Sequence, residues 1–279
     1  MNWCTSTLKP PSLFVKPRSE HGLGMHHRAA VHCVLHLLDL GVTKHVLANA
    51  YWKLVYGGMV AGPTAKDRID LVWGLVQEEY RKTKENIQIH RPGLSSFCDP
   101  RSPHADYPLM KGKGAEMRHL APVTRIVWDR FARPDVPEDM HMSRVLQYLT
   151  QIYQVIDYKR EDGLPPPVLP ESVVLDLQRS IDRLLVHYSF LHDRAATAEA
   201  KARLLFNLVP KFHHLYHLGQ EALYTNPRLG WTYSNEDWMS LIQRVGQAYR
   251  HGVPMSTRAG PMLRAWAVGQ AVSLKYSRC

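Results

Sequence analysis

Apolar residues recur at three- and four-residue spacing along most of this chain, which is the periodicity of α-helices with a buried face. The first such segment covers residues 26–55, and Gly41 in its middle predicts a break between two helices of a buried hairpin. The next covers residues 62–86, where Thr64 is a predicted N-cap with Asp67 three residues later. Strand patterns are scarce. The chain is therefore predicted to be mainly α-helical.

Further helical segments follow the same periodicity. They cover residues 115–131, 142–159, 171–193 and 197–210, and Pro210 is predicted to close the last of them.

Prolines and glycines divide the chain into four regions. Residues 1–25 mix prolines with polar and basic residues, which predicts an extended basic arm without a core of its own. Residues 26–163 form a predicted helical body with a long loop near 89–114. The proline-rich spacer at 164–170 is the best internal boundary, and residues 171–279 form a C-terminal helical region.

Charge favours an anionic partner. The 279 residues include 35 Lys and Arg against 25 Asp and Glu, a formal charge of +10. Such an excess favours nucleic acid as the partner. The alternative is a charge spread evenly over the surface, which would steer no partner, and the sequence contains no compact block of Lys and Arg.

Cysteine placement and hydropathy indicate the compartment. The four cysteines lie far apart and form no disulfide framework, which favours a reducing environment. No apolar run reaches membrane-spanning length, and the N-terminus has no apolar core of a secretory signal. We therefore expect a soluble intracellular protein without a membrane partner.

Most common catalytic motifs are absent from the sequence, including GxGxxG, GxxxxGK[ST], GxSxG and HExxH. A first candidate is Cys33-x-x-His36, because a thiol and an imidazole one helical turn apart can share a metal or a hydrogen bond. The alternative is a buried Cys33 and an interior His36 whose hydrogen bonds are satisfied.

The second candidate is a group of histidines in which His213 and His217 lie four residues apart, on one face of a helix, with His214 between them. His213 and His217, together with Cys33 and His36, would complete a zinc site of one thiolate and three imidazoles. The alternative is a cluster at a helix start that faces solvent.

The third candidate is acidic. Ser234 is placed as an N-cap, and Glu236 and Asp237 follow in the first turn of a predicted helix. A glutamate carried by a helix is a usual last member of two-metal phosphoryl-transfer sites. The alternative is that these carboxylates only complement the helix dipole.

Taken in order, these motifs resemble the RNase H-like DDE transposases of the branch that contains the hAT and CACTA groups. Cys33 and His36 match the C/D-x-x-H signature of that branch. The C-terminal stretch is similar to the CACTA-type pattern of an HxxxHL element and an EA pair before a WMYPFERFM-like string. The matching positions are His213, His217, Leu218, Glu221, Ala222 and the string WTYSNEDWM at 231–239. The resemblance spans roughly residues 26–252.

The resemblance implies a helical insertion and C-terminal helices, with Glu236 as the catalytic glutamate and a Mg²⁺ ligand, and His36 and Cys33 close to the site. It implies DNA as the partner and a nuclear location, and it leaves homo-oligomerisation open. Two catalytic aspartates should precede the signature, but residues 1–32 contain no aspartate, and the register does not allow Asp39 to replace one. The chain is therefore expected to resemble the C-terminal part of a transposase and to be inactive.

Two hypotheses of different classes follow. The first is a transposase-derived fragment whose ancestral activity is metal-dependent DNA strand cleavage and transfer. The second is a non-catalytic helical protein that binds nucleic acid or a protein partner through a basic surface, with Glu236 as a capping carboxylate.

Overall fold

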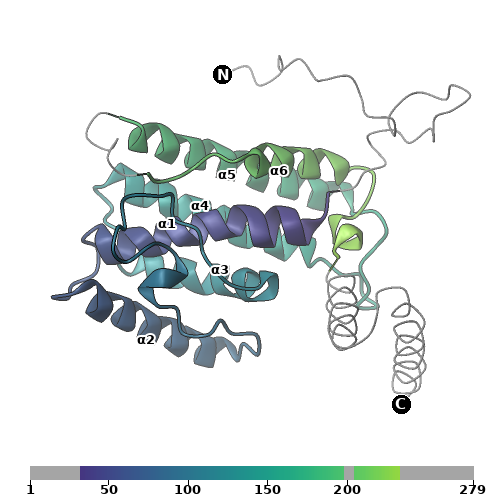
Figure 1. The fold of residues 1–279 in the computed structure, drawn as a ribbon. Coiled ribbons are helices and arrows are strands. Elements are labelled where there is room, and N and C mark those ends of the chain that lie inside the picture. Colours follow the sequence, from purple (N-terminus) through teal and green to yellow (C-terminus); the bar gives the residue numbers. More distant parts are fainter. Residues whose placement is uncertain (1–31, 198–203, 233–279) are drawn as a thin grey trace, which may run out of the picture. The chain divides into compact units, whose positions relative to one another are not determined.

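A computed structural model of the chain describes residues 32–197 and 204–232 as a bundle of helices (Figure 1). The described residues contain no strand, so the predicted mainly α-helical fold is confirmed. The predicted arm at 1–25 lies outside them. The elements are η3 (Leu35–Val42), α1 (Thr43–Tyr56), α2 (Ala65–Thr83), η4 (Leu94–Ser96), α3 (Gly114–Asp129), α4 (Pro137–Ile156), α5 (Glu171–Ala195), α6 (Pro210–Glu221) and η6 (Pro227–Gly230).

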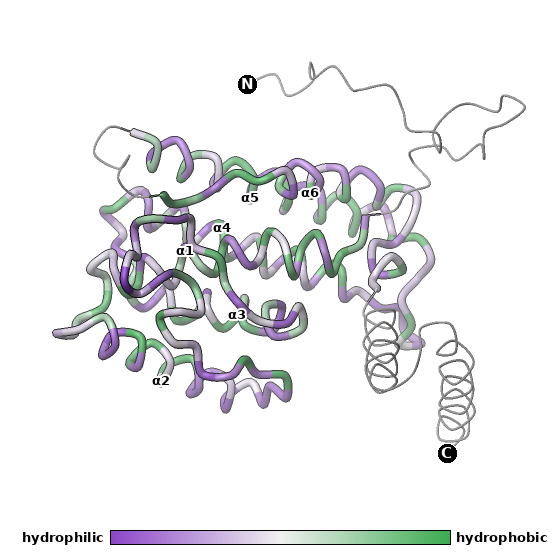
Figure 2. Tube along the Cα trace, in the orientation of Figure 1, coloured by the Kyte–Doolittle hydropathy of each residue, from purple (hydrophilic) through white to green (hydrophobic). Residues whose placement is uncertain are grey.

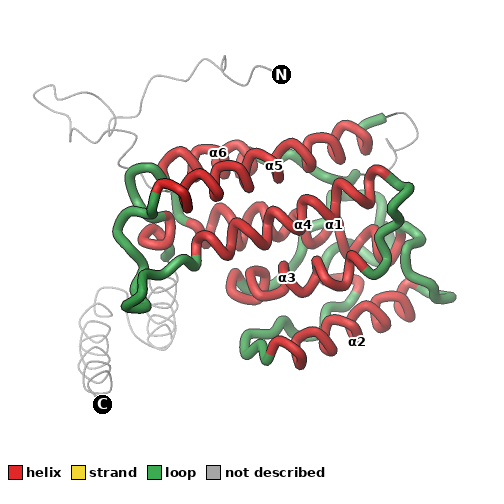
Figure 3. Tube along the Cα trace, turned by 180° about the vertical axis from the view of Figure 1, so that it is seen from behind, coloured by secondary structure: helices red, strands yellow, loops and turns green. Residues whose placement is uncertain are grey.

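Helix α1 forms the middle of the bundle. It packs against η3, α2, α3 and α4, and its large side chains Leu47, Tyr51 and Trp52 are almost completely buried. Helix α2 lies at one edge, on the opposite side of the bundle from α5 and α6, in both the front and back views (Figures 1 and 3). Hydrophobic and hydrophilic positions alternate along α2 (Figure 2), as expected of a helix with one solvated face.

Helices α4 and α5 pack against each other although the proline-rich spacer separates them in the sequence. The buried apolar residues of α5 recur at intervals of three and four residues, which is the spacing expected of one apolar face that packs against another helix. Its buried apolar residues are Val174, Leu177, Ile181, Leu184, Tyr188 and Leu191.

Asn226 fixes the spacer to the rest of the bundle. Its backbone N–H donates to the carbonyl of Pro167 at 2.9 Å, and its side-chain amide donates to the carbonyl of Pro166 at 2.8 Å. The described residues up to Trp231 belong to one compact unit. The spacer therefore connects helices within this unit.

Local signals at the start of α2 and in the long loop are confirmed. Thr64 Oγ1 accepts a hydrogen bond from the backbone N–H of Asp67 at 3.1 Å, and the Asp67 carboxylate accepts one from the Thr64 N–H at 3.1 Å. The loop before α3 contains only the short η4 helix. It is attached to the core by three buried side chains, Ile89, Phe97 and Met110.

Two predicted boundaries are wrong. Gly41 does not break the helix, because η3 continues directly into α1. Pro210 does not close a helix but occupies the first turn of α6. A proline is well accommodated there because its missing N–H would have no partner within the helix.

Element η3 is a π-helix of eight residues, with wider turns than an α-helix. Its apolar residues are buried except for the half-buried Leu40, and one carboxylate, Asp39, is buried with them. Segments of this kind are short and occur frequently at functional sites, which directs attention to what η3 contacts.

Candidate functional site

Helix α6 packs against η3 and α5, and its two faces have different compositions. The inner face buries Phe212, Leu215 and Leu218. The outer face carries His213 and His214, which are exposed, and the half-buried His217. The predicted HxxxH pair therefore lies on one helix, and that helix contacts the element that follows Cys33.

His32 connects the two segments. Its ring Nδ1 lies 2.7 Å from Glu221 Oε1, and its backbone N–H donates to Glu221 Oε2 at 3.1 Å. Its ring Nε2 lies 3.0 Å from Nδ1 of His214. Because Glu221 holds the ring and the backbone of His32 together, the orientation of this imidazole is fixed.

His213 and His217 form a second pair, with their Nε2 atoms 3.0 Å apart. The His217 ring lies parallel to that of His32, with centroids 6.4 Å apart. These four side chains are called the histidine cluster below: His32, His213, His214 and His217.

Burial lowers the pKa of His214 and of His217 below the ordinary histidine value of 6.5, and the neighbouring histidines lower both pKa values further. In each close pair one ring nitrogen must accept while the other donates, so the neutral imidazole is favoured. The lowered pKa values of His214 and His217 therefore favour the neutral forms of these two imidazoles.

Cys33 and His36 form the predicted local pair. The His36 ring Nδ1 lies 3.3 Å from the Cys33 sulfur. Cys33 is half-buried and His36 is exposed, so the alternative of an interior His36 is wrong. Neither the catalytic role of the pair nor its role in zinc binding is tested by this contact.

The zinc hypothesis stays a prediction. Its four residues are Cys33, His36, His213 and His217, and they lie on elements that pack against each other. Within residues 32–197 and 204–232 no group of three or more His, Cys, Asp or Glu side chains has an arrangement that could hold a metal ion.

Sequence reasoning missed His32 and the role of Glu221. A signal for Glu221 was present, because His213, His217 and Glu221 follow at four-residue intervals and so share one helix face. His32 directly precedes the Cys33-x-x-His36 motif, but nothing local indicates that its partner lies 189 residues further along the chain.

A buried polar network lies on the inner side of η3. The fully buried Asp39 accepts a hydrogen bond from the Tyr153 hydroxyl at 2.7 Å and one from the Trp231 indole N–H at 3.2 Å. The Tyr153 hydroxyl is also 2.7 Å from Thr43 Oγ1. Arg118 lies over the Trp231 ring, 4.2 Å from its centroid. Trp231 is thereby attached to η3, the helix that contains His36.

The acidic candidate lies beyond these residues. Ser234, Glu236 and Asp237 are outside the part of the chain that the structure describes. Glu236 follows Trp231 by five residues in the sequence.

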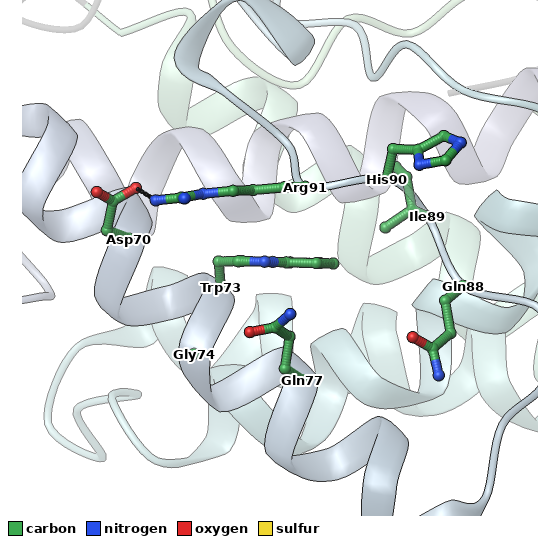
Figure 4. A pocket seen from close by; sticks show the side chains of 8 residues that line it. All are labelled: Asp70, Trp73, Gly74, Gln77, Gln88, Ile89, His90 and Arg91. Atoms are coloured by element: carbon green, nitrogen blue, oxygen red, sulfur yellow. Dashed lines mark hydrogen bonds and ion pairs between the residues drawn. The ribbon is translucent and has the colours of Figure 1, made fainter.

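A separate groove of about 610 Å³ lies between α2 and the loop that follows it (Figure 4). Arg91 Nη2 is paired with Asp70 Oδ1 at 2.6 Å, and the Trp73 ring is only 7% exposed. With its cation paired and its aromatic ring covered, this groove is a weaker candidate than the histidine cluster. Its lining residues are Asp70, Trp73, Gly74, Gln77, Gln88, Ile89, His90 and Arg91.

Comparison of the chain with protein-family models, with curated proteins and with solved structures finds no match. In the described part of the chain, every helix is too short or too polar to cross a membrane.

Proposed function

We propose that this chain is derived from an RNase H-like DNA transposase and that its ancestral activity is metal-dependent DNA cleavage and strand transfer. The observation that carries the proposal is the contact between the two motif-bearing elements. His32, next to the Cys33 signature, bonds Glu221 of the HxxxH helix across 189 residues of sequence. In the resembled family the C/D-x-x-H histidine lies near the catalytic site to which the glutamate after the HxxxHL element belongs, so a contact between the two motif-bearing elements is expected of a relative.

The buried network supports the same proposal. Asp39 bonds Trp231, the first residue of the string WTYSNEDWM. Glu236, the proposed catalytic glutamate, comes five residues after Trp231 in the sequence. Trp231 itself is hydrogen-bonded to η3, the helix that contains His36.

The residues of this chain do not fit a pair of Mg²⁺ ions. Such a pair needs several converging carboxylate oxygens, and the resemblance assigns only Glu236 to that role. The histidine cluster offers imidazole nitrogens, which suit zinc and other transition metals better than Mg²⁺. We therefore propose that the 279-residue chain does not cleave DNA.

The test of this proposal starts from the genomic DNA on both sides of the coding region. We expect a reading frame with two aspartates in strand-like sequence, and terminal inverted repeats beyond it. The chain joined to that frame should nick DNA that ends in these repeats when Mg²⁺ is supplied.

In the joined protein, Glu236→Gln should reduce cleavage by at least about 100-fold, because a metal ligand is lost. Asp237→Asn, a neighbouring carboxylate change, is the matched control and should retain cleavage. Flanking DNA with neither feature, or cleavage that survives Glu236→Gln, would contradict the proposal.

A second candidate function is non-catalytic binding of nucleic acid in the nucleus, and the distribution of charge favours it. The described residues contain 23 Lys and Arg against 21 Asp and Glu, whereas the remaining residues contain 12 against 4. Most of the basic excess therefore lies in residues 1–31 and 233–279. An affinity for duplex DNA that falls steeply as salt rises would support this function, and no affinity at low salt would contradict it.

A further inference from the structure

A groove of about 480 Å³ lies between α4 and α5, and we call it the α4–α5 groove. Three half-buried apolar side chains give it a hydrophobic floor that packs against the core: Val155 of α4, Tyr158 just after α4, and Val173 of α5. Its volume falls within the range of about 300–1,000 Å³ that is usual for small-molecule sites. An apolar floor of this kind suits the flat face of a ring.

Two carboxamides of α4 also line the groove, those of Gln151 and Gln154. Neither carboxamide is hydrogen-bonded to another residue within the described ranges 32–197 and 204–232. Each offers both a donor and an acceptor, which is the combination that the edge of a nucleobase can satisfy. A purely apolar ligand would cover these groups without giving them partners, and an unsatisfied buried polar group is costly.

Arg183 of α5 supplies positive charge at the groove. Its guanidinium lies over the ring of Tyr148, 5.7 Å from the centroid, and that ring stacks on His187 with centroids 5.7 Å apart. Arg183 makes no ion pair with a carboxylate of the described residues. The contact with Tyr148 holds the guanidinium in place, so less side-chain entropy would be lost when its N–H groups bind an anion.

The nearby carboxylates do not neutralise Arg183. Asp176, the carboxylate among the lining residues, is paired with Arg179 at 3.6 Å. Asp182 lies four residues after Gln178, whose side chain donates to a backbone carbonyl of α6 at 3.0 Å, so Asp182 belongs to the face of α5 that meets α6. Two arginines and one carboxylate therefore line the groove, which leaves an excess of one positive charge.

We propose that the α4–α5 groove binds a nucleotide unit, with the base on the floor at Tyr158 and the phosphate on the guanidinium of Arg183. The apolar floor suits the face of a base, the two carboxamides suit its edge, and the unpaired guanidinium suits a phosphate. The proposal goes beyond the proposed transposase origin and does not rest on it, because none of these residues belongs to the motifs of that resemblance.

The same chemistry is offered by a free nucleotide and by one residue of a single-stranded nucleic acid, so the test uses both. Isothermal titration calorimetry of the full chain measures its affinity for AMP, for adenosine and for inorganic phosphate. AMP should bind, and adenosine and phosphate should each bind at least about tenfold more weakly, because each lacks the contacts of the missing half.

Fluorescence anisotropy of the full chain measures its affinity for a labelled single strand of deoxyadenylates. A strand of the same length that lacks its bases keeps the phosphates, so it reports attraction to the backbone alone. A duplex keeps its base faces in its own stacks and should not compete with AMP for the groove.

Variants test the two ends of the groove. Arg183→Gln should weaken AMP binding at least about tenfold, because a charge-assisted hydrogen bond to the phosphate is lost. The matched control is Arg194→Gln, which removes an exposed arginine of the same helix that is paired with Glu138, outside the groove. That control should retain the wild-type affinity.

Tyr158→Leu should weaken AMP binding at least about fivefold, which is the lower end of the effect of losing one base–aromatic stack. Tyr158→Phe keeps the ring and should retain the affinity. Circular dichroism should show that each variant is folded, and Arg183 is exposed, so its replacement disturbs no core residue.

Each outcome supports or overturns the proposal. AMP binding that needs both Arg183 and Tyr158 would identify a site for a free nucleotide. Binding of the base-containing strand alone, with the same dependence on these residues, would identify a site for single-stranded nucleic acid. No binding of either probe, equal affinity for AMP and phosphate, or binding that either variant leaves unchanged would overturn the proposal. None of these results bears on the proposed origin, which the cleavage assay of the joined protein tests separately.

Discussion

Asp39 joins three distant parts of the chain at a single carboxylate. It lies in η3, and its hydrogen-bond donors come from α4 and from the segment after η6. The side chain is fully buried. A buried carboxylate is stable only when donors compensate for its lost hydration, so Asp39, Tyr153 and Trp231 depend on one another.

Replacement of Asp39 by Ala should lower the free energy of unfolding by about 3 kcal/mol, because the change leaves the indole N–H of the half-buried Trp231 without its acceptor and a cavity beside it. The matched control is Asp176→Ala, because Asp176 is an exposed carboxylate on α5. That control should change stability by less than about 0.5 kcal/mol. Urea unfolding of both variants measures the difference, and equal stabilities would show that the Asp39 hydrogen bonds add nothing.

At this scale the sequence identifies residue types but not their partners. The pairing of Cys33 with His36 and of His213 with His217 could be predicted, because spacings of three and four residues on a helix bring side chains together. The partners of Asp39 lie 114 and 192 residues away. Such contacts depend on how the helices pack, and no local pattern encodes them.

At the scale of elements, the continuous helix formed by η3 and α1 depends on the small size of Gly41. A glycine inside a helix normally costs about 1 kcal/mol relative to alanine. Here the missing side chain leaves room for the stem of Lys211, which crosses from α6. The helix–helix contact therefore offsets the weak helix propensity.

We expect Gly41→Ala to destabilise the protein by roughly 1–2 kcal/mol, because the added methyl group would lie 2.5 Å from Lys211 Cδ and 3.0 Å from the backbone carbonyl oxygen of His36. In a Lys211→Ala background the same change should cost less, since the overlapping stem is gone. Gly74→Ala in α2 is the control: its added Cβ would meet no atom within 4 Å, so it should stabilise by up to about 1 kcal/mol. Thermal unfolding of the wild type, the two single variants and the double variant measures the coupling free energy between the two positions. If Gly41→Ala costs the same with and without Lys211, the contact between them is refuted.

The same element shows where boundary prediction fails. Gly41 and Pro210 both carry strong helix-breaking signals in the sequence. A glycine can also sit inside a helix where another chain segment approaches closely, and a proline can open a helix as well as end one. Tertiary packing chooses between these outcomes, whereas helices with a clear apolar stripe and a capping box, such as α2, can be predicted from local sequence alone.

At the scale of the whole molecule, most of the excess positive charge lies outside the residues that the structure describes. The described helical body is nearly neutral, although the full sequence has a formal charge of +10. Composition alone could not show this division, because it gives no information on where along the chain the charges lie.

The location of the charge predicts how salt affects DNA binding. Arg244→Gln with Arg250→Gln, in the basic residues 233–279, should weaken binding. The plot of log affinity against log salt should become less steep, by roughly one unit of slope for each DNA phosphate that these arginines no longer neutralise. Arg144→Gln with Arg179→Gln changes the same number of charges on exposed positions of α4 and α5 and should leave the slope unchanged. Equal slopes for both double variants would contradict a role for residues 233–279.

The π-helical geometry of η3 makes the length of this segment part of the site. Its wide turns accommodate residues that a regular α-helix of the same rise would not hold. Deletion of one residue with the wide turns retained would rotate everything before it by about 100° about the helix axis. His32 would then turn away from Glu221. Insertions and deletions in residues 35–42 should therefore be selected against more strongly than substitutions.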